Sequence, residues 1–131
     1  MSIIRHPKFL QTILIIDAAA CVAIALLMVA GADEIATLTQ FPASLLLYAG
    51  LSLFPIGAYI AFVATRKTLS RAGVWLVMLG NFGWVAGSIA LLAGGLISPN
   101  ALGYVFVAFQ AVAVALLADL EYVGLRATVV R

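Results

Sequence analysis

The sequence predicts an all-α membrane protein, a single domain over residues 1–131 built as a four-transmembrane-helix bundle in two hairpins. Two observations carry this prediction. Hydrophobic residues make up 66% of the chain and charged residues only 9%, against roughly 25% charged residues in a soluble domain. The charges also lie in short groups that separate long apolar runs, as in a chain that crosses a lipid bilayer repeatedly.

The helix boundaries follow from charge, proline and glycine. A first apolar run is interrupted only by Asp17, and a second begins after Pro42. The uncharged stretch 72–118 would form a helix about 70 Å long at ~1.5 Å per residue, whereas a bilayer core is about 30 Å thick. It must turn back at the Gly- and Pro-containing segment 94–100. The predicted spans are 9–31, 43–65, 73–94 and 101–123.

The basic residues predict the orientation. All of them lie on one side of the expected membrane, whereas the first outer loop carries Asp33 and Glu34. By the positive-inside rule, both termini and the loop near Arg66 are expected in the cytoplasm. Such groups suit the anionic headgroups of membrane lipids, and no basic stripe indicates nucleic acid. The basic residues are Arg5, Lys8, Arg66, Lys67, Arg71, Arg126 and Arg131.

One alternative concerns the first span. Arg5 and Lys8, an apolar region and Ala30-Gly31-Ala32 together imitate a signal peptide with its cleavage site. The apolar region is long enough to span a bilayer, which favours a retained helix.

The predicted membrane spans lack the residues that several kinds of chemistry require. Cys21 is the single cysteine and His6 the single histidine, and His6 precedes the first helix. A bis-histidine haem, a zinc site and a Ser–His–Asp set are therefore not expected within the membrane. We expect no metal, no cofactor and no enzymatic activity.

Small residues predict packing faces, because membrane helices approach closely where side chains are small. Gly80, Gly83 and Gly87 fall within one stripe of the third span, and Gly83 and Gly87 form a GxxxG pair. Ala111 and Ala115 form a similar stripe on the fourth span. Either stripe is expected to pack within the bundle or between protomers.

Polar residues predict a possible proton or ligand site. Asp17, Tyr59, Asn81 and Asp119 each lie about 10–15 Å from the basic end of their helix, at ~1.5 Å per residue. If their faces meet, they form one buried cluster in the cytoplasmic half. Glu121 is assigned to a different face, close to interfacial water.

Two interpretations of this cluster stay open. An intramembrane carboxylate costs roughly 2.5–3.5 kcal/mol and is a functional-site hypothesis by default. Protonation, or hydrogen bonds from Asn81 or Tyr59, would relieve that cost and equip the cluster to carry protons. Alternatively, Asp17 only fastens helices together and Asp119 faces interfacial water.

Five segments carry a resemblance to a known group of proteins. They are IDAAA at 16–20, GNFGW at 80–84, FQA at 109–111, ADLEY at 118–122 and GLR at 124–126. In these the chain resembles small, uncharacterised four-span inner-membrane proteins of bacteria, which bring no activity that can be transferred. In size and in its early carboxylate the chain is also similar to small multidrug-resistance exporters, which are proton antiporters, but their other motifs are absent.

The leading functional hypothesis is a packing or assembly component without enzymatic activity, in the bacterial inner membrane. It would self-associate or join a larger membrane complex. The alternative is a proton-coupled transporter of a small solute or cation that uses Asp17. A third class, a lipid- or quinone-binding enzyme, would require a cavity that opens to the membrane beside these groups.

Overall fold

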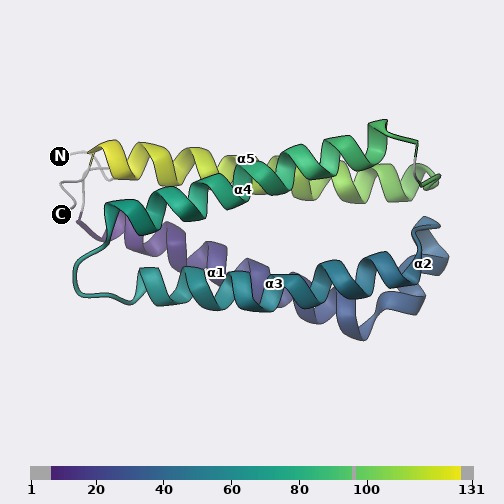
Figure 1. Cartoon of the computed structure of the whole chain (residues 1–131), viewed down its shortest axis with the longest axis horizontal. Helices are drawn as coiled ribbons and strands as arrows, with labels where there is room; N and C mark the ends of the chain where they lie inside the picture. Colours follow the sequence, from purple (N-terminus) through teal and green to yellow (C-terminus); the bar gives the residue numbers. More distant parts are fainter. Residues whose placement is uncertain (1–6, 96, 128–131) are drawn as a thin grey trace.

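The structure, a computed structural model, describes residues 7–95 and 97–127. Within these ranges the chain is helical, without strands. The helices are α1 (Pro7–Ala30), α2 (Ala32–Thr39), α3 (Ala43–Ala64), α4 (Arg71–Ala93) and α5 (Ala101–Ala127). All except α2 are long and apolar enough to cross a membrane. The predicted four-helix membrane bundle is confirmed (Figure 1).

The observed boundaries lie close to the predicted ones, with two differences. Helix α5 continues to Ala127, beyond the expected end at residue 123. The segment between α1 and α3, expected to be a loop, contains the short helix α2. Asp33 and Glu34 stand in its first turn, where they interact favourably with the positive end of the helix dipole. Gln40, with a left-handed φ of 62°, ends it.

The bundle consists of two hairpins, as predicted. Helix α1 lies along α3, and α4 lies along α5 (Figure 1). Gly50 and Gly57 bring α3 close to α1. A Cβ atom at Gly50 would lie 2.9 Å from Cβ of Met28, and one at Gly57 would lie 3.1 Å from Cγ2 of Val22. Small residues thus allow the close backbone approach that stabilises membrane helix pairs.

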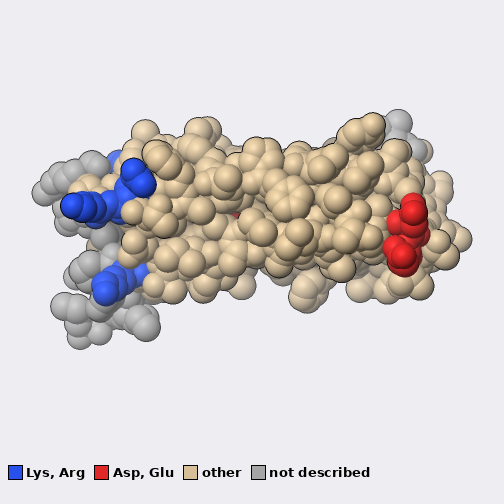
Figure 2. Space-filling model, turned by 90° about the horizontal axis from the view of Figure 1, so that it is seen from below, with Lys and Arg blue, Asp and Glu red and all other residues tan. Residues whose placement is uncertain are grey.

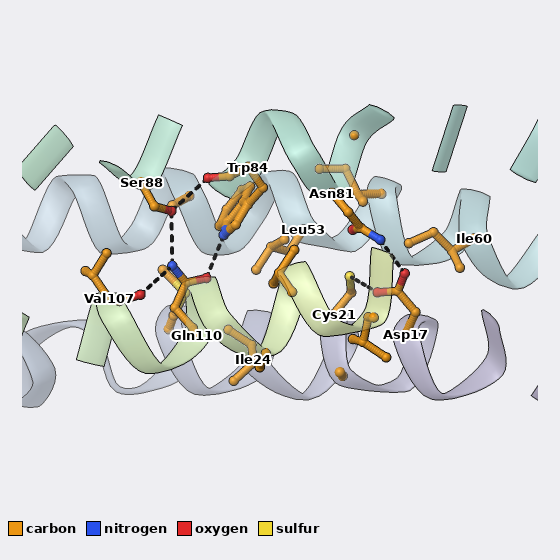
Figure 3. A pocket seen from close by; sticks show the side chains of 18 of the residues that line it. Asp17, Cys21, Ile24, Leu53, Ile60, Asn81, Trp84, Ser88, Val107 and Gln110 are labelled. Carbon is orange, nitrogen blue, oxygen red and sulfur yellow. Dashed lines mark hydrogen bonds between the residues drawn. The ribbon is translucent and has the colours of Figure 1, made fainter. Parts of the chain in front are cut away.

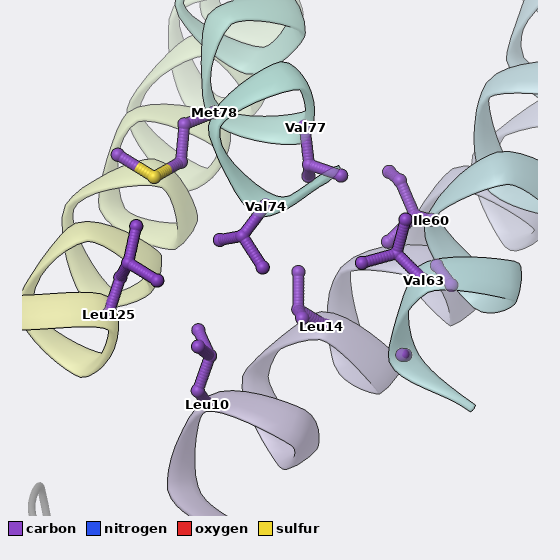
Figure 4. Packing of buried hydrophobic residues seen from close by; sticks show 10 residues of the cluster. Leu10, Leu14, Ile60, Val63, Val74, Val77, Met78 and Leu125 are labelled. Atoms are coloured by element: carbon purple, nitrogen blue, oxygen red, sulfur yellow. The ribbon is translucent and has the colours of Figure 1, made fainter. Parts of the chain in front are cut away.

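The two hairpins meet at the end of the bundle where α1 begins and α5 ends, which we call the terminal end. There all four long helices contribute to one buried apolar cluster, the terminal cluster (Figure 4). Its members are Leu10, Leu14, Ala18, Ile60, Val63, Ala64, Val74, Val77, Met78 and Leu125.

At the opposite end, the loop end, Asn100 joins the hairpins. Its backbone N–H donates to the carbonyl of Thr39 at 3.1 Å, and its side-chain amide donates to the carbonyl of Leu38 at 2.8 Å. Its Oδ1 accepts from the N–H of Gly103 at 2.9 Å and so caps α5. The hairpins are therefore tied at both ends of the bundle.

Charge separates along the same axis. The described Lys and Arg residues are exposed and gather at the terminal end, whereas Asp33 and Glu34 are exposed at the loop end (Figure 2). Arg5 and Arg131 of the predicted basic set lie outside the described residues.

We expect Gly57→Leu to lower the free energy of unfolding by about 1–3 kcal/mol, the usual effect of overpacking. The new side chain would collide with Val22 and Cys21 of α1. Unfolding in mixed micelles with increasing SDS measures the change. The matched control is Gly83→Leu, because a Cβ at Gly83 meets no atom within 4 Å. Equal stability of the two variants would contradict the close α1–α3 approach.

Candidate functional site

Between the two hairpins lies a cavity of about 810 Å³, which we call the hairpin cavity. All four long helices line it, and its walls are mostly apolar. This volume lies within the range of roughly 300–1,000 Å³ typical of small-molecule sites. The polar side chains that line the cavity are Asp17, Cys21, Tyr59, Asn81, Trp84, Ser88 and Gln110 (Figure 3).

Toward the terminal end, three buried polar residues meet, and we call them the acid cluster. The side-chain amide of Asn81 donates to Oδ2 of Asp17 at 2.7 Å and to Oε1 of Glu121 at 2.9 Å. Asp17 is 2% exposed, Asn81 6% and Glu121 0%. One asparagine on α4 thereby joins a carboxyl on α1 to a carboxyl on α5.

The two carboxyls of the acid cluster lie beside each other, because both accept from the same amide nitrogen of Asn81. No donor in the described part of the chain reaches Oε2 of Glu121. Two buried carboxylates this close do not both stay ionised, because like charges repel and burial disfavours charge. A proton on one of the carboxyls would supply the missing donor and relieve the repulsion.

A second polar network lies farther along the cavity, toward the loop end. The indole N–H of Trp84 donates to Oε1 of Gln110 at 2.7 Å, and the Gln110 amide donates to Oγ of Ser88 at 3.0 Å. The Ser88 hydroxyl donates back to the carbonyl of Trp84 at 2.8 Å. This closed network fixes the indole on the cavity wall (Figure 3).

The structure brings together part of the predicted site. Asp17 and Asn81 meet, as the depth argument predicts. Tyr59 also lines the cavity, but its hydroxyl donates to the carbonyl of Gly73 at 3.4 Å. Asp119 is exposed and Glu121 is buried, so the predicted assignment of these two carboxylates to their faces was wrong.

A signal for Glu121 is present in the sequence of α5. Gly103, Val107, Gln110 and Glu121 are separated by 4, 3 and 11 residues, or about one, one and three helical turns, so they share one helix face. Gly103, Val107 and Glu121 are buried, and Gln110 lines the cavity. Two polar residues, Gln110 and Glu121, on the face of Gly103 mark the inner face of α5, whereas the alanine stripe lies on a different face.

The glycines and alanines predicted to pack helices together do not make the tightest helix–helix contacts in the structure. A Cβ at Gly80, Gly83 or Gly87 would meet no atom within 4 Å, so these residues pack against nothing in the described chain. Ala111 and Ala115 are half-buried and line a smaller cavity of about 310 Å³ between α4 and α5. The alternative of packing between protomers stays open for the glycines.

In residues 7–95 and 97–127, no group of three or more His, Cys, Asp or Glu side chains is placed to hold a metal ion. The two carboxyls and the amide of the acid cluster can exchange protons, form hydrogen bonds and attract positive charge.

We expect Asn81→Leu to lower the free energy of unfolding by about 1–3 kcal/mol, because it leaves two buried carboxyls without their amide donor. Asp119→Asn is the control: it removes a carboxylate from the same helix as Glu121, but from an exposed position, and should leave stability unchanged. SDS unfolding in mixed micelles measures both. If Asn81→Leu were as stable as the unmodified chain, Asn81 would not hold the acid cluster together.

No protein-family model matches the chain, and comparison with curated proteins and with solved structures gave no match either.

Proposed function

We propose that the chain is a small membrane carrier without enzymatic activity, which binds a lipophilic solute in the hairpin cavity and couples that binding to a proton. One observation carries the proposal. Two buried carboxyls, from Asp17 and Glu121, accept from the same Asn81 amide, and Asp17 lines the cavity. Ionisable groups within membrane helices typically mark ion pathways and proton relays.

A purely structural role accounts less well for the acid cluster. Interhelical hydrogen bonds in membrane proteins contribute about 0.6 kcal/mol on average, whereas a carboxylate at the centre of a membrane helix costs roughly 2.5–3.5 kcal/mol. A neutral amide in place of each carboxyl would fasten the helices at a lower cost. A residue that only holds helices together is also expected among well-packed side chains, whereas Asp17 borders a cavity.

The surroundings of the acid cluster suit a carrier with access from one side at a time. Toward the terminal end, Leu10, Leu14, Val74 and Leu125 are buried in the terminal cluster and separate the carboxyls from that surface. Toward the middle of the bundle, Asp17 borders the cavity. Access from the terminal end would require the two hairpins to separate at this cluster, as in the rocking of two halves around a fixed site.

The charge distribution supports a location in the bacterial inner membrane with both termini in the cytoplasm. The exposed basic residues gather at the terminal end (Figure 2). Lys and Arg concentrate on cytoplasmic ends of membrane helices and interact there with anionic headgroups. The cavity and the acid cluster then lie within the thickness of the bilayer.

Infrared difference spectroscopy in lipid bilayers tests the proton-binding role. As the buffer is titrated from acidic to alkaline, we expect the band of a protonated carboxyl to disappear reversibly, because the proton of the acid cluster exchanges with water. The band should be absent from the double variant Asp17→Asn, Glu121→Gln and unchanged in Asp119→Asn. A carboxyl band that persists unchanged throughout the titration would indicate a fixed structural proton and overturn the proposed function.

A second candidate function, assembly through α4, rests on a separate observation. Gly83 and Gly87 form a GxxxG pair, both residues are exposed, and a Cβ at either would meet nothing within 4 Å. Such a face allows the close approach of another helix. We propose that it contacts a second copy of the chain or a membrane-protein partner.

We expect the double variant Gly83→Leu, Gly87→Leu to lose self-association, because two large side chains would hold the helices apart. Single-molecule photobleaching in bilayers counts the copies in each assembly. Gly80→Leu is the control, since Gly80 is equally uncrowded but lies on the cavity wall. A chain that is monomeric before substitution, with no partner found by crosslinking in native membranes, would contradict this second candidate.

A further inference from the structure

The hydrogen-bond donors on the wall of the hairpin cavity are already used. Both N–H groups of the Asn81 amide go to the carboxyls of the acid cluster. Both N–H groups of the Gln110 amide go to Ser88 and to the carbonyl of Val107. The Trp84 indole and the Ser88 hydroxyl donate within the same network.

The remaining donors on this wall are committed as well. The hydroxyl of Tyr59 donates to the carbonyl of Gly73, and the thiol of Cys21 points to Oδ1 of Asp17 at 3.9 Å. No Lys, Arg or His stands among the described residues that line the cavity. A solute in the cavity therefore finds no free side-chain donor and no positive charge.

Acceptors, in contrast, are in excess. Apart from the neighbouring Glu121 carboxyl, the Asp17 carboxyl has the Asn81 amide at Oδ2 and only the distant thiol at Oδ1. Behind it, Oε2 of Glu121 is buried without any donor in the described chain. Buried polar atoms are nearly always paired, so a buried acceptor without a donor needs a proton, a water or a ligand that brings one.

We infer that the solute of the hairpin cavity is a lipophilic ammonium ion, a cation with N–H donors and an apolar body. This inference rests on the proposed function. An anion, or a neutral molecule whose only polar atoms are carbonyl oxygens, would lose its hydration in the cavity without gaining a donor. An ammonium group supplies both the donors and the positive charge that the two carboxyls lack.

Charge balance links the solute to the proton. In the proposed exchange, the cavity without solute holds one proton on its two carboxyls, which leaves one negative charge. When the ammonium group binds, its positive charge takes over the role of that proton, and the proton leaves to water. The net charge of the cavity is the same before and after, so the exchange adds no uncompensated buried charge.

The apolar body finds suitable walls and a route from the bilayer. Trp84 is held on the wall by its network, and an indole face attracts cations as well as apolar groups. Ile56 and Tyr59 on α3, and Leu76 and Gly80 on α4, line the cavity and are also exposed at the surface. The cavity therefore opens between α3 and α4 onto the lipid-facing side.

Three fluorescent probes with one apolar body test the inference: 1-naphthylmethylammonium, 1-naphthalenemethanol and 1-naphthoate. Binding is measured by equilibrium dialysis against the protein in lipid nanodiscs, with empty nanodiscs subtracted. We expect the ammonium probe to bind at least about tenfold more tightly than either other probe, because it alone gains an ion pair in a site without free donors. Its binding should weaken at lower pH, where protons compete, and should release a proton in weakly buffered solution.

Variants locate the site and separate the possible outcomes. Gly80→Leu should weaken ammonium binding by narrowing the cavity, whereas Gly83→Leu, on the same helix but not on the cavity wall, should leave it unchanged. Asp17→Asn should remove the preference for the ammonium probe. If the alcohol or the naphthoate bound as tightly as the ammonium probe, and Gly80→Leu weakened that binding, the ammonium inference would be overturned. Binding of a solute in the cavity would still stand. No saturable ammonium binding would overturn the ammonium inference too, while the infrared band of the acid cluster decides independently whether the proton-binding role stands.

Discussion

Asn81 occupies the position on which the arrangement of the two hairpins depends. In lipid, apolar side chains gain little by meeting one another, so helices associate through close packing and shared polar groups. Asn81 lies on α4 and donates to Asp17 on α1 and Glu121 on α5. These contacts join the two hairpins inside the bundle, where Asn81 is buried, and they keep the two carboxyls beside each other.

The two helices of each hairpin are held together by different kinds of contact. Gly50 and Gly57 let α1 and α3 pack backbone to backbone, whereas Gln110 and Trp84 link α5 to α4 by a side-chain hydrogen bond. Between the hairpins, contact concentrates at the two ends, in the terminal cluster and around Asn100. The middle is left open as a cavity bordered by the acid cluster. A bundle selected only for stability would fill this space, because unfilled volume forfeits packing energy.

The candidate site could be predicted in part from depth alone. Counting residues from the basic ends places Asp17 and Asn81 at similar depths. In the structure, Nδ2 of Asn81 lies 2.7 Å from Oδ2 of Asp17. Depth does not tell which side of a helix faces inward. Asp119 and Glu121 are two positions apart and so point about 200° apart around the helix at 3.6 residues per turn. The two residues differ little in depth, so choosing the wrong face of α5 exchanges the inner carboxylate for the outer one.

The four apolar spans, and the end of the bundle at which the basic residues gather, could be predicted from residue types alone. A membrane-spanning helix needs an apolar run of a set length, and such a run can be recognised in the sequence without knowing its neighbours. The positions of three features required the folded bundle: Glu121 lies inside, Gly50 and Gly57 make the close helix contact, and Gly83 and Gly87 face outward. Each of these depends on how a helix is rotated against its neighbours. In a helix that is apolar on every side, hydrophobicity does not mark the inner face, so that rotation is set by contacts between distant residues.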